Sequence, residues 1–316
     1  MLALGKKKFT GVSQFLARFR GWIQAGAALL TNLHLPNFLK GGLYQGAGKT
    51  VCVPGLNCYS CPAASGACPI GAFQAVVGSS KFSFSYYITG ILILLGVLLG
   101  RFICGFLCPF GWFQELLHKI PSRKLSTRKL KPLRYLKYAI LLVMVFLLPA
   151  FLVNDVGMGD PFFCKYLCPQ GVLEGAIPLS LANSGIRAAL GSLFTWKLGI
   201  LLVVIVLSVL FYRPFCKWIC PLGAFYALLN KVSLVQMKVD QSKCISCGKC
   251  AKACKMDVDV TKSPNHTECI RCGMCVRACP TNAVHFRCGF GTGKQGTVLP
   301  EKTNKQMNDI VKEKKS

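Results

Sequence analysis

Long uncharged, apolar stretches alternate with basic segments over the first two thirds of the chain. One uncharged stretch covers residues 82–100, a second covers 138–154, and a third covers 198–212 and extends back toward residue 189. A weaker apolar stretch covers residues 21–35. Because about 17–25 apolar residues cross the hydrocarbon core of a bilayer, this pattern predicts four membrane-spanning helices.

Basic residues lie on one side of these predicted helices. They are dense before residue 21, in the segment 119–134 and after the fourth helix, and they are sparse in 41–80 and 154–196. Since lysine and arginine collect in cytoplasmic loops, we expect both ends of the chain to be cytoplasmic and the two sparse loops to lie outside. The expected location is the cell membrane of a bacterium or an archaeon, crossed several times.

Composition narrows the class of protein. Of the 316 residues, 53% are hydrophobic and only 16% are charged, whereas about 25% are charged in ordinary soluble domains. Lysine and arginine exceed the acidic residues by 38 to 11, for a formal charge of +27. Basic loops beside membrane helices attract anionic lipid headgroups, so we expect membrane lipids as partners and no nucleic acid. The 19 cysteines then predict a metal-binding function.

A motif with two cysteines and a proline occurs three times, with a fourth, incomplete copy. The copies are Cys104-Gly-Phe-Leu-Cys108-Pro, Cys164-Lys-Tyr-Leu-Cys168-Pro, Cys216-Lys-Trp-Ile-Cys220-Pro and the variant Ala67-Cys68-Pro69. Proline is favoured at the first position of a helix, so the cysteine before it should lie at a helix N-terminus, where N–H groups favour a thiolate. The alternation of helices and motifs indicates a duplicated two-helix unit.

The duplication predicts one [4Fe–4S] cluster on the inner side of the membrane, because neither repeat alone supplies four thiolates there. The predicted inner ligands are Cys104, Cys108, Cys216 and Cys220.

The outer side has more cysteines than a single cluster needs. Cys164 and Cys168 require two partners from the first repeat, and the candidates are Cys52, Cys58, Cys61 and Cys68. Repeat position favours Cys68, with Cys61 as the second partner. Two alternatives stay open: the four candidates form a cluster alone, or Cys52 and Cys58 are spare or form a disulfide in an oxidising compartment.

Two runs of four cysteines follow the last predicted helix, each with the spacing C-x₂-C-x₂-C-x₃-C. This spacing holds two [4Fe–4S] clusters, with each run giving its fourth cysteine to the other cluster. The predicted ligands of cluster one are Cys244, Cys247, Cys250 and Cys279, and those of cluster two are Cys269, Cys272, Cys275 and Cys254. Zinc is the rival for paired Cys-x-x-Cys units, but two complete runs favour iron. Cys288 is expected to be spare.

Other cofactor ligands are weaker candidates. His34 and His118 lie near predicted membrane interfaces, where haem or quinone could contact them, but a hydrogen-bonded role is favoured. The inner and outer cysteine sites should lie at opposite faces of the membrane, too far apart for fast direct electron tunnelling. Either the short fourth helix brings them closer, or a quinone or another bound cofactor lies between them.

The set of motifs resembles the NapH-type membrane ferredoxins, with the C-terminal half of NosR and the CcoG-type proteins as more distant relatives. The resemblance rests on Cys-Tyr-Ser-Cys-Pro at 58–62, Ala-Cys-Pro-Ile-Gly-Ala at 67–72, the three complete motifs and the double cysteine run. It implies electron transfer between a cytoplasmic donor or the quinone pool and an extracytoplasmic reductase or flavoprotein.

We therefore expect an α-helical membrane protein in three parts. Residues 1–232 form a four-helix transmembrane bundle, residues 233–290 form an α+β ferredoxin module with two [4Fe–4S] clusters, and residues 291–316 form a flexible basic tail. The predicted role is an electron-transfer subunit of a redox complex, in preference to a stand-alone enzyme. The alternatives are a redox assembly factor that reduces a metal or cofactor during maturation of a partner, and a cluster-stabilised scaffold.

Overall fold

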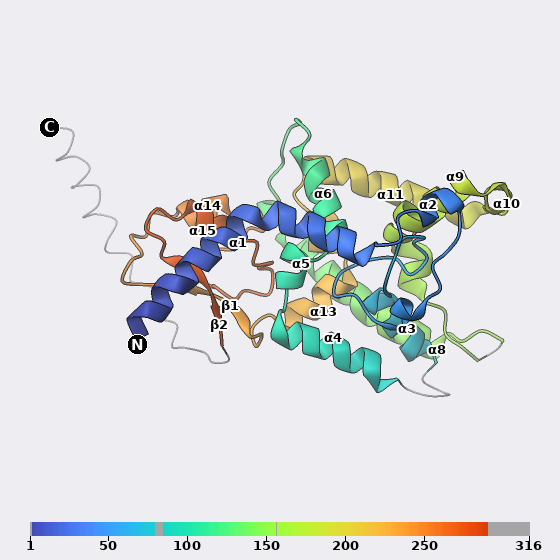
Figure 1. Cartoon of the computed structure of the whole chain (residues 1–316), viewed down its shortest axis with the longest axis horizontal. Coiled ribbons are helices and arrows are strands. Elements are labelled where there is room, and N and C mark those ends of the chain that lie inside the picture. The colour runs from blue at the N-terminus through green and yellow to red at the C-terminus, as the bar shows by residue number, and fades with distance from the viewer. Residues whose placement is uncertain (1, 80–84, 156, 290–316) are drawn as a thin grey trace.

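The chain folds into an elongated, mainly helical molecule. The computed structural model describes residues 2–79, 85–155 and 157–289. A small C-terminal module with the two strands lies at one end of the long axis, and the loops that precede and follow the middle helices lie at the other end (Figure 1). The expected basic tail over 291–316 lies outside the described residues.

Short helices make up most of the first part of the chain, because the cysteine motifs interrupt the longer ones. The first half consists of α1 (Leu2–Thr31), α2 (Asn37–Lys40), η1 (Ala47–Thr50), α3 (Pro69–Gly78), α4 (Tyr86–Leu98), α5 (Phe102–Phe106), α6 (Pro109–Lys119), η2 (Arg128–Tyr135), α7 (Leu136–Ile140), η3 (Leu141–Leu147) and α8 (Leu148–Phe151). The second half consists of η4 (Phe163–Leu167), η5 (Gly171–Ala176), α9 (Ile177–Ala182), α10 (Ser184–Ala188), α11 (Ser192–Leu210), α12 (Pro214–Trp218) and α13 (Pro221–Leu229).

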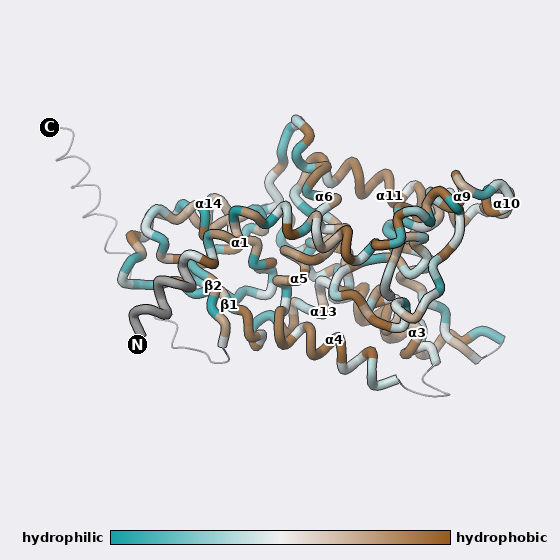
Figure 2. Tube along the Cα trace, viewed as in Figure 1, coloured by the Kyte–Doolittle hydropathy of each residue, from teal (hydrophilic) through white to brown (hydrophobic). Residues whose placement is uncertain are grey.

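Two helical stretches among the described residues are long and apolar enough to cross a membrane. They are the continuous run Leu130–Phe151 and α11, which match the third and fourth predicted spans. Apolar residues are concentrated along α11 and α4, as the hydropathy colours of Figure 2 show. The expected four-helix bundle is therefore not confirmed.

The other two predicted spans differ from expectation for identifiable reasons. The second is represented by α4, which has 13 residues, and residues 82–84 of that prediction lie outside the described part. The first, residues 21–35, begins inside α1 and continues past its end at Thr31. The N-terminal part of α1 packs against the C-terminal module, where the Ser13 hydroxyl accepts a hydrogen bond from the Phe286 N–H at 3.0 Å. Ser13 lies before the predicted span, so this contact leaves the prediction for residues 21–35 untested.

The C-terminal module contains β1 (Val235–Val239), α14 (Lys249–Ala253), α15 (Met274–Ala278) and β2 (Val284–Cys288). The strands pair antiparallel, with Met237 opposite Phe286, and both of these side chains are buried. This confirms the expected small ferredoxin-like unit with a short sheet at the C-terminal end of the helical part. A shared core with α1 and α5, through Ala17 and Phe106, fixes the module to the rest of the chain.

The two cysteine runs of the module have the same backbone conformation. In both, the residue before the second cysteine has a positive φ, 51° at Ser246 and 53° at Arg271. The residue after that cysteine is a glycine with positive φ, Gly248 or Gly273. Glycine adopts this conformation without steric cost, so both runs close around the same kind of loop.

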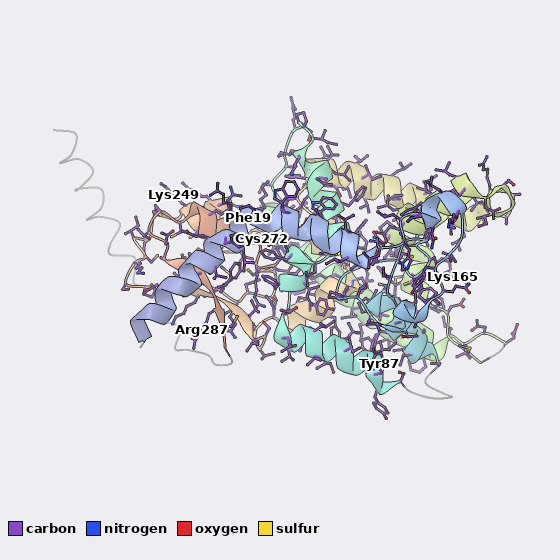
Figure 3. All side chains as sticks on the ribbon, in the orientation of Figure 1. Phe19, Tyr87, Lys165, Lys249, Cys272 and Arg287 are labelled. Carbon is purple, nitrogen blue, oxygen red and sulfur yellow. The ribbon has the colours of Figure 1, made fainter. Side chains whose placement is uncertain are left out.

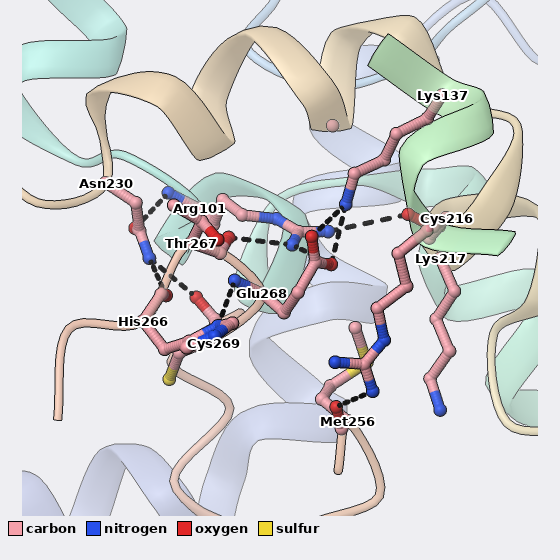
Figure 4. A network of polar contacts seen from close by, with 12 residues as sticks. Arg101, Lys137, Cys216, Lys217, Asn230, Met256, His266, Thr267, Glu268 and Cys269 are labelled. Atoms are coloured by element: carbon pink, nitrogen blue, oxygen red, sulfur yellow. Dashed lines mark hydrogen bonds and ion pairs between the residues drawn. The ribbon is translucent and has the colours of Figure 1, made fainter. Parts of the chain in front are cut away.

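Buried ion pairs join the module to the helices (Figure 4). The Glu268 carboxylate forms ion pairs with the Arg101 guanidinium, at 2.9 Å, and with the Lys137 ammonium, at 2.6 Å. Neither cationic side chain is exposed. Burial alone would raise the pKa of Glu268, but Arg101 and Lys137 lower it to about 2. The Asn230 side chain also donates to the carbonyl of Cys269 at 3.1 Å. The loop that carries the second cysteine run is thus held in one place against the membrane part.

Neutralising Glu268 should strongly destabilise this junction. Glu268→Gln leaves Arg101 and Lys137 buried without an anion, and breaking a buried pair in this way costs about 3–5 kcal/mol. We expect the variant to unfold at lower urea concentration and its module to become sensitive to protease. The matched control is Asp160→Asn, which removes a partly exposed pair with Lys165 and should cost roughly 0–1 kcal/mol. Equal stability of the two variants would contradict the role given to Glu268.

Candidate iron–sulfur sites

In three of the four Cys-Pro motifs the cysteine lies directly at the start of a helix, as predicted, whereas Cys168 ends η4 and the next helix begins after Gln170. Cys68, Cys108 and Cys220 cap α3, α6 and α13, and in each case the proline is in the first turn. The glycine three residues after the cysteine donates its N–H to the sulfur, at 3.4 Å from Gly111 and 3.3 Å from Gly223. The motif therefore points its sulfur away from the helix and toward a partner segment.

Burial opposes the thiolate form that these helix N-termini favour. It raises the pKa of Cys68 to about 11 and the pKa values of Cys108 and Cys168 to about 12, in spite of the N–H groups that face each sulfur. The predicted stabilisation of a free thiolate is thus outweighed by desolvation. A bound cation would reverse this balance, because metal binding displaces the thiol proton.

The structure brings together the inner cysteines of both repeats. Burial raises the pKa of Cys220, and the neighbouring Cys216, Cys104 and Cys108 raise it further. All four side chains are buried. Two segments that are separated along the chain by the third and fourth predicted spans thus meet at one site.

Two arginines are arranged reciprocally around this inner site. Arg101 lies three residues before Cys104 and donates to the carbonyl of Cys216 at 3.4 Å. Arg213 lies three residues before Cys216 and donates to the carbonyl of Cys104. Neither side chain is exposed. Positive charge in these positions suits a group that carries net negative charge, as a cluster with four thiolates does.

The surroundings of Cys164 indicate which cysteines lie close together on the outer side. Burial raises the pKa of Cys164, and Cys168, Cys68 and Cys58 raise it further. These four cysteines are therefore neighbours. Cys61, the expected second partner, packs with Ala63 and Ala64 beside Cys58, and its sulfur lies 3.6 Å from the side-chain oxygen of Asn32. Its predicted role as a ligand stays a prediction.

Glutamine side chains support the inner and outer sites in the same way. Gln114, six residues after Cys108, donates to the Cys216 sulfur at 3.2 Å and accepts the Phe215 N–H at 3.2 Å. Gln74, six residues after Cys68, donates to the Cys164 sulfur at 3.1 Å and accepts the N–H of Phe163 at 3.0 Å. The sequence interpretation missed these residues, although their fixed spacing from the Cys-Pro cysteine was visible.

The corresponding position after Cys168 explains the place of Cys58. This residue is Glu174, whose carboxylate accepts the N–H of Cys58 at 3.0 Å. A Cβ on Gly171 would lie 3.6 Å from the Cys58 sulfur, so that sulfur faces the start of the helix after Cys168. By this contact Cys58 occupies the place that Cys164 and Cys216 have in the other repeats.

In the module, the cysteines predicted for cluster one line a single hollow. Its volume is about 330 Å³, including solvent at its mouth, and its walls include Cys244, Cys247, Cys250 and Cys279. The Ile245 side chain beside it is 52% exposed. A site in this hollow is accessible from solvent.

The cysteines predicted for cluster two lie on the side of the module that faces the helices. Burial raises the pKa of Cys275, and Cys269, Cys272 and Cys254 add to the rise. Figure 3 places Cys272 beneath α1, whereas Lys249 points outward from α14. Cys254, Cys269 and Cys272 thus lie near Cys275, and their grouping as ligands of one cluster stays a prediction.

Cys52, Cys288, His34 and His118 belong to none of these cysteine groups. Cys52 is buried and Cys288 is exposed, and all nineteen cysteines are free thiols, so no disulfide joins Cys52 to Cys58. His34 stacks on Tyr44, with ring centroids 3.7 Å apart, and His118 contacts the edge of Tyr212. These are ring contacts and not the hydrogen bonds expected for the two histidines, and the Nδ1 atoms of both are buried without a hydrogen-bond partner among the described residues.

The four cysteine groups fit [4Fe–4S] clusters in ligand type and number. Each cysteine of such a cluster binds a different iron atom, so the four sulfurs need not converge on one point. Within the described ranges, no three His, Cys, Asp or Glu side chains approach closely enough to share one metal ion.

Two family models, both described as 4Fe–4S binding domain, match the chain. One matches residues 66–87, 83–128, 137–177 and 193–240, which contain the Cys-Pro motifs. The other matches residues 237–258 and 263–285, which contain the double cysteine run.

Curated relatives support the same grouping. An uncharacterised protein of Methanocaldococcus jannaschii is 28% identical over 182 residues, which are 54% of this chain and 66% of the relative. The methylamine utilization ferredoxin-type protein MauN of Methylorubrum extorquens is 27% identical over 198 residues, 60% of this chain and 56% of MauN. The ferredoxin-type protein NapH of Haemophilus influenzae is 26% identical over 179 residues, 56% of this chain and 54% of NapH.

The chain thus spans between half and two thirds of the length of these relatives. No solved structure matches it. The resemblance to NapH-type proteins that the motifs predicted is confirmed.

Proposed function

The chain belongs to the ferredoxin-type 4Fe–4S proteins, and we propose that it is a membrane-bound relay that passes single electrons between its ferredoxin module and its outer cysteine site. The observation that carries this proposal is the meeting of cysteines from both repeats at a buried inner site beside the module. An arrangement of this kind makes a continuous series of redox sites from one end of the molecule to the other.

Four [4Fe–4S] clusters are assigned to sixteen cysteines. Bound clusters supply reversible one-electron oxidation and reduction. In the module, cluster one is assigned to Cys244, Cys247, Cys250 and Cys279, and cluster two to Cys254, Cys269, Cys272 and Cys275. In the membrane part, the inner cluster is assigned to Cys104, Cys108, Cys216 and Cys220, and the outer cluster to Cys58, Cys68, Cys164 and Cys168.

The module and the inner site are in direct contact, which supports electron passage between them. A side chain on Gly105, between Cys104 and Cys108, would collide with the carbonyl oxygen of Ile270 and lie 3.7 Å from the N atom of Cys272. Cluster two is therefore the part of the module nearest to the inner site. Cluster one, with its open hollow, is the contact point for an external donor.

A membrane position is supported by the exposure of apolar side chains. In α11, Leu202, Val203 and Val206 are each more than half exposed, and a surface of this kind is stable against lipid, not water. We assign residues 1–232 to the membrane part, 233–290 to a cytoplasmic module and 291–316 to a tail. The partners are then a cytoplasmic donor or the quinone pool and an extracytoplasmic reductase or flavoprotein.

Iron content and redox titration test this function. Anaerobically purified protein should contain about sixteen iron atoms per chain, at four per cluster, and a one-electron donor should reduce all clusters reversibly. A content of about eight, unchanged by Cys104→Ser, would limit the clusters to the module. Full iron content without reversible reduction would instead indicate a scaffold. If an assembly factor is the true role, the partner should remain active after this protein is removed from the mature complex.

A further inference from the structure

A short piece of the outer loop lies deep in the molecule, between the inner and outer cysteine sites. Leu56 is 2% exposed and Asn57 is fully buried. A Cβ on Gly55 would lie 2.9 Å from the Cα of Cys108 and 3.1 Å from the ring of Pro109. Only a residue without a side chain allows this approach, so the loop backbone packs directly on an inner ligand.

Two successive N–H groups of this segment face sulfurs of different sites. Leu56 packs in one core with Cys108 and Cys68, and its N–H faces the sulfur of Cys108, which belongs to the inner group. The N–H of Asn57 faces the sulfur of Cys68, which belongs to the outer group. A single residue of backbone thus separates the two donors, and the next residue along the chain is Cys58 itself.

Tyr226 anchors the segment from the opposite side. Its side chain is fully buried, and its hydroxyl donates to the carbonyl of Pro54 at 3.0 Å. Tyr226 lies six residues after Cys220, the position that Gln74 and Gln114 have after their own cysteines. In this repeat the residue six positions after the Cys-Pro cysteine is Tyr226, which binds the loop at Pro54 and not a neighbouring cysteine.

One apolar core contains ligands of both sites. Leu56, Cys68, Cys108, Cys168 and Tyr226 all belong to it. The two sites are therefore not separated by a layer of lipid-facing helix, as the predicted topology had implied. The outer loop re-enters the protein and brings its cysteines toward the inner group.

We propose that the segment Pro54–Asn57, held by Tyr226, is the bridge through which electrons pass directly between the inner and outer clusters, without an intervening quinone. This inference rests on the proposed function. In each transfer the inner cluster loses one electron and is oxidised, and the outer cluster gains it and is reduced. No bond forms or breaks and no proton moves. The electron originates from a one-electron donor protein at the module and leaves to an oxidising partner at the outer site.

Magnetic coupling in the unmodified protein gives the first test. In the full chain, purified anaerobically and fully reduced, the inner and outer clusters should show spin–spin broadening in electron paramagnetic resonance. Cys68→Ser, which removes an outer ligand, should abolish the part of the broadening that the outer cluster causes and leave the inner signal coupled to cluster two of the module alone. Inner and outer signals without any coupling would overturn the bridge and leave the proposed function intact. Absence of both signals from the unmodified protein would overturn the proposed function as well.

Kinetics of two loop variants give the second test. Tyr226→Phe removes the hydrogen bond to Pro54 at nearly constant volume, and Gly55→Ala pushes the loop away from Cys108. After flash reduction of the module, both variants should retain full iron content but transfer electrons from the inner to the outer cluster severalfold more slowly. The controls are Tyr87→Phe, on an exposed side chain, and Gly199→Ala, where a Cβ meets nothing within 4 Å. If Gly55→Ala fails to fold, Tyr226→Phe decides the outcome. An unchanged rate in Tyr226→Phe with weaker spin coupling would also contradict the bridge, because rate and coupling depend on the same separation.

Discussion

Cys108→Ser and Cys220→Ser should each remove the same iron–sulfur signal, although the two residues belong to different repeats. Both sulfurs lie in the buried inner group, and each is close to Cys104 and Cys216. A cluster that loses one thiolate must recruit another ligand, and few are available in a buried, apolar site. We expect each variant to lose about four iron atoms and to stop electron passage beyond the module.

A variant that combines Cys108→Ser with Cys220→Ser distinguishes one cluster shared by both repeats from two independent clusters. Ligands of one cluster act as a unit, so combining Cys108→Ser with Cys220→Ser should be no worse than either change alone. Cys288→Ser is the matched control, since this cysteine is exposed and outside every group. Two distinct signals, one lost in each single variant, would contradict an inner cluster built from both repeats.

Cys58→Ser should remove the outer signal, whereas Cys61→Ser should leave it in place. The sulfur of Cys58 faces the start of the helix after Cys168, and its N–H is held by Glu174 at 3.0 Å. Cys61 turns toward Asn32. Iron content should fall by about four atoms in Cys58→Ser, as it should in Cys68→Ser and Cys168→Ser.

The comparison of Cys58 with Cys61 is well controlled because the two residues share one turn. The N–H of Cys61 is hydrogen-bonded to the carbonyl of Cys58 at 3.1 Å, so a general disturbance of this turn would affect both variants. Loss of the outer signal in Cys61→Ser, with retention in Cys58→Ser, would restore the ligand set expected from repeat position. Loss in both would point to damage of the turn itself.

Local features of the sites could be predicted from the sequence. The capping role of Cys108 and Cys220 depends only on the neighbouring proline and glycine, and it is observed. The paired loops of the module follow from the spacing of its two cysteine runs. In both cases the residues that set the geometry lie within a few positions of one another.

Features that depend on distant contacts could not be predicted. The position of Cys58 depends on a hydrogen bond from its N–H to the carboxylate of Glu174, which lies 116 residues later in the chain. The side chain of Arg20, directly before the predicted span 21–35, donates to the carbonyl of Gly105 at 3.0 Å, a contact between residues 85 positions apart. The re-entrant loop at Gly55 depends on the absence of a side chain opposite Cys108, which no apolar pattern records.

The most direct test of the central claim is electron transfer across a sealed vesicle. The full chain is inserted into lipid vesicles that contain trapped cytochrome c, and a reduced, membrane-impermeant ferredoxin is added outside. Only molecules whose module faces outward can accept its electrons. The account predicts reduction of the trapped cytochrome c by the unmodified protein and no reduction by Cys108→Ser, with Cys288→Ser behaving like the unmodified protein. Equal reduction in Cys108→Ser vesicles, or none in any vesicle although the module clusters are reduced, would contradict it.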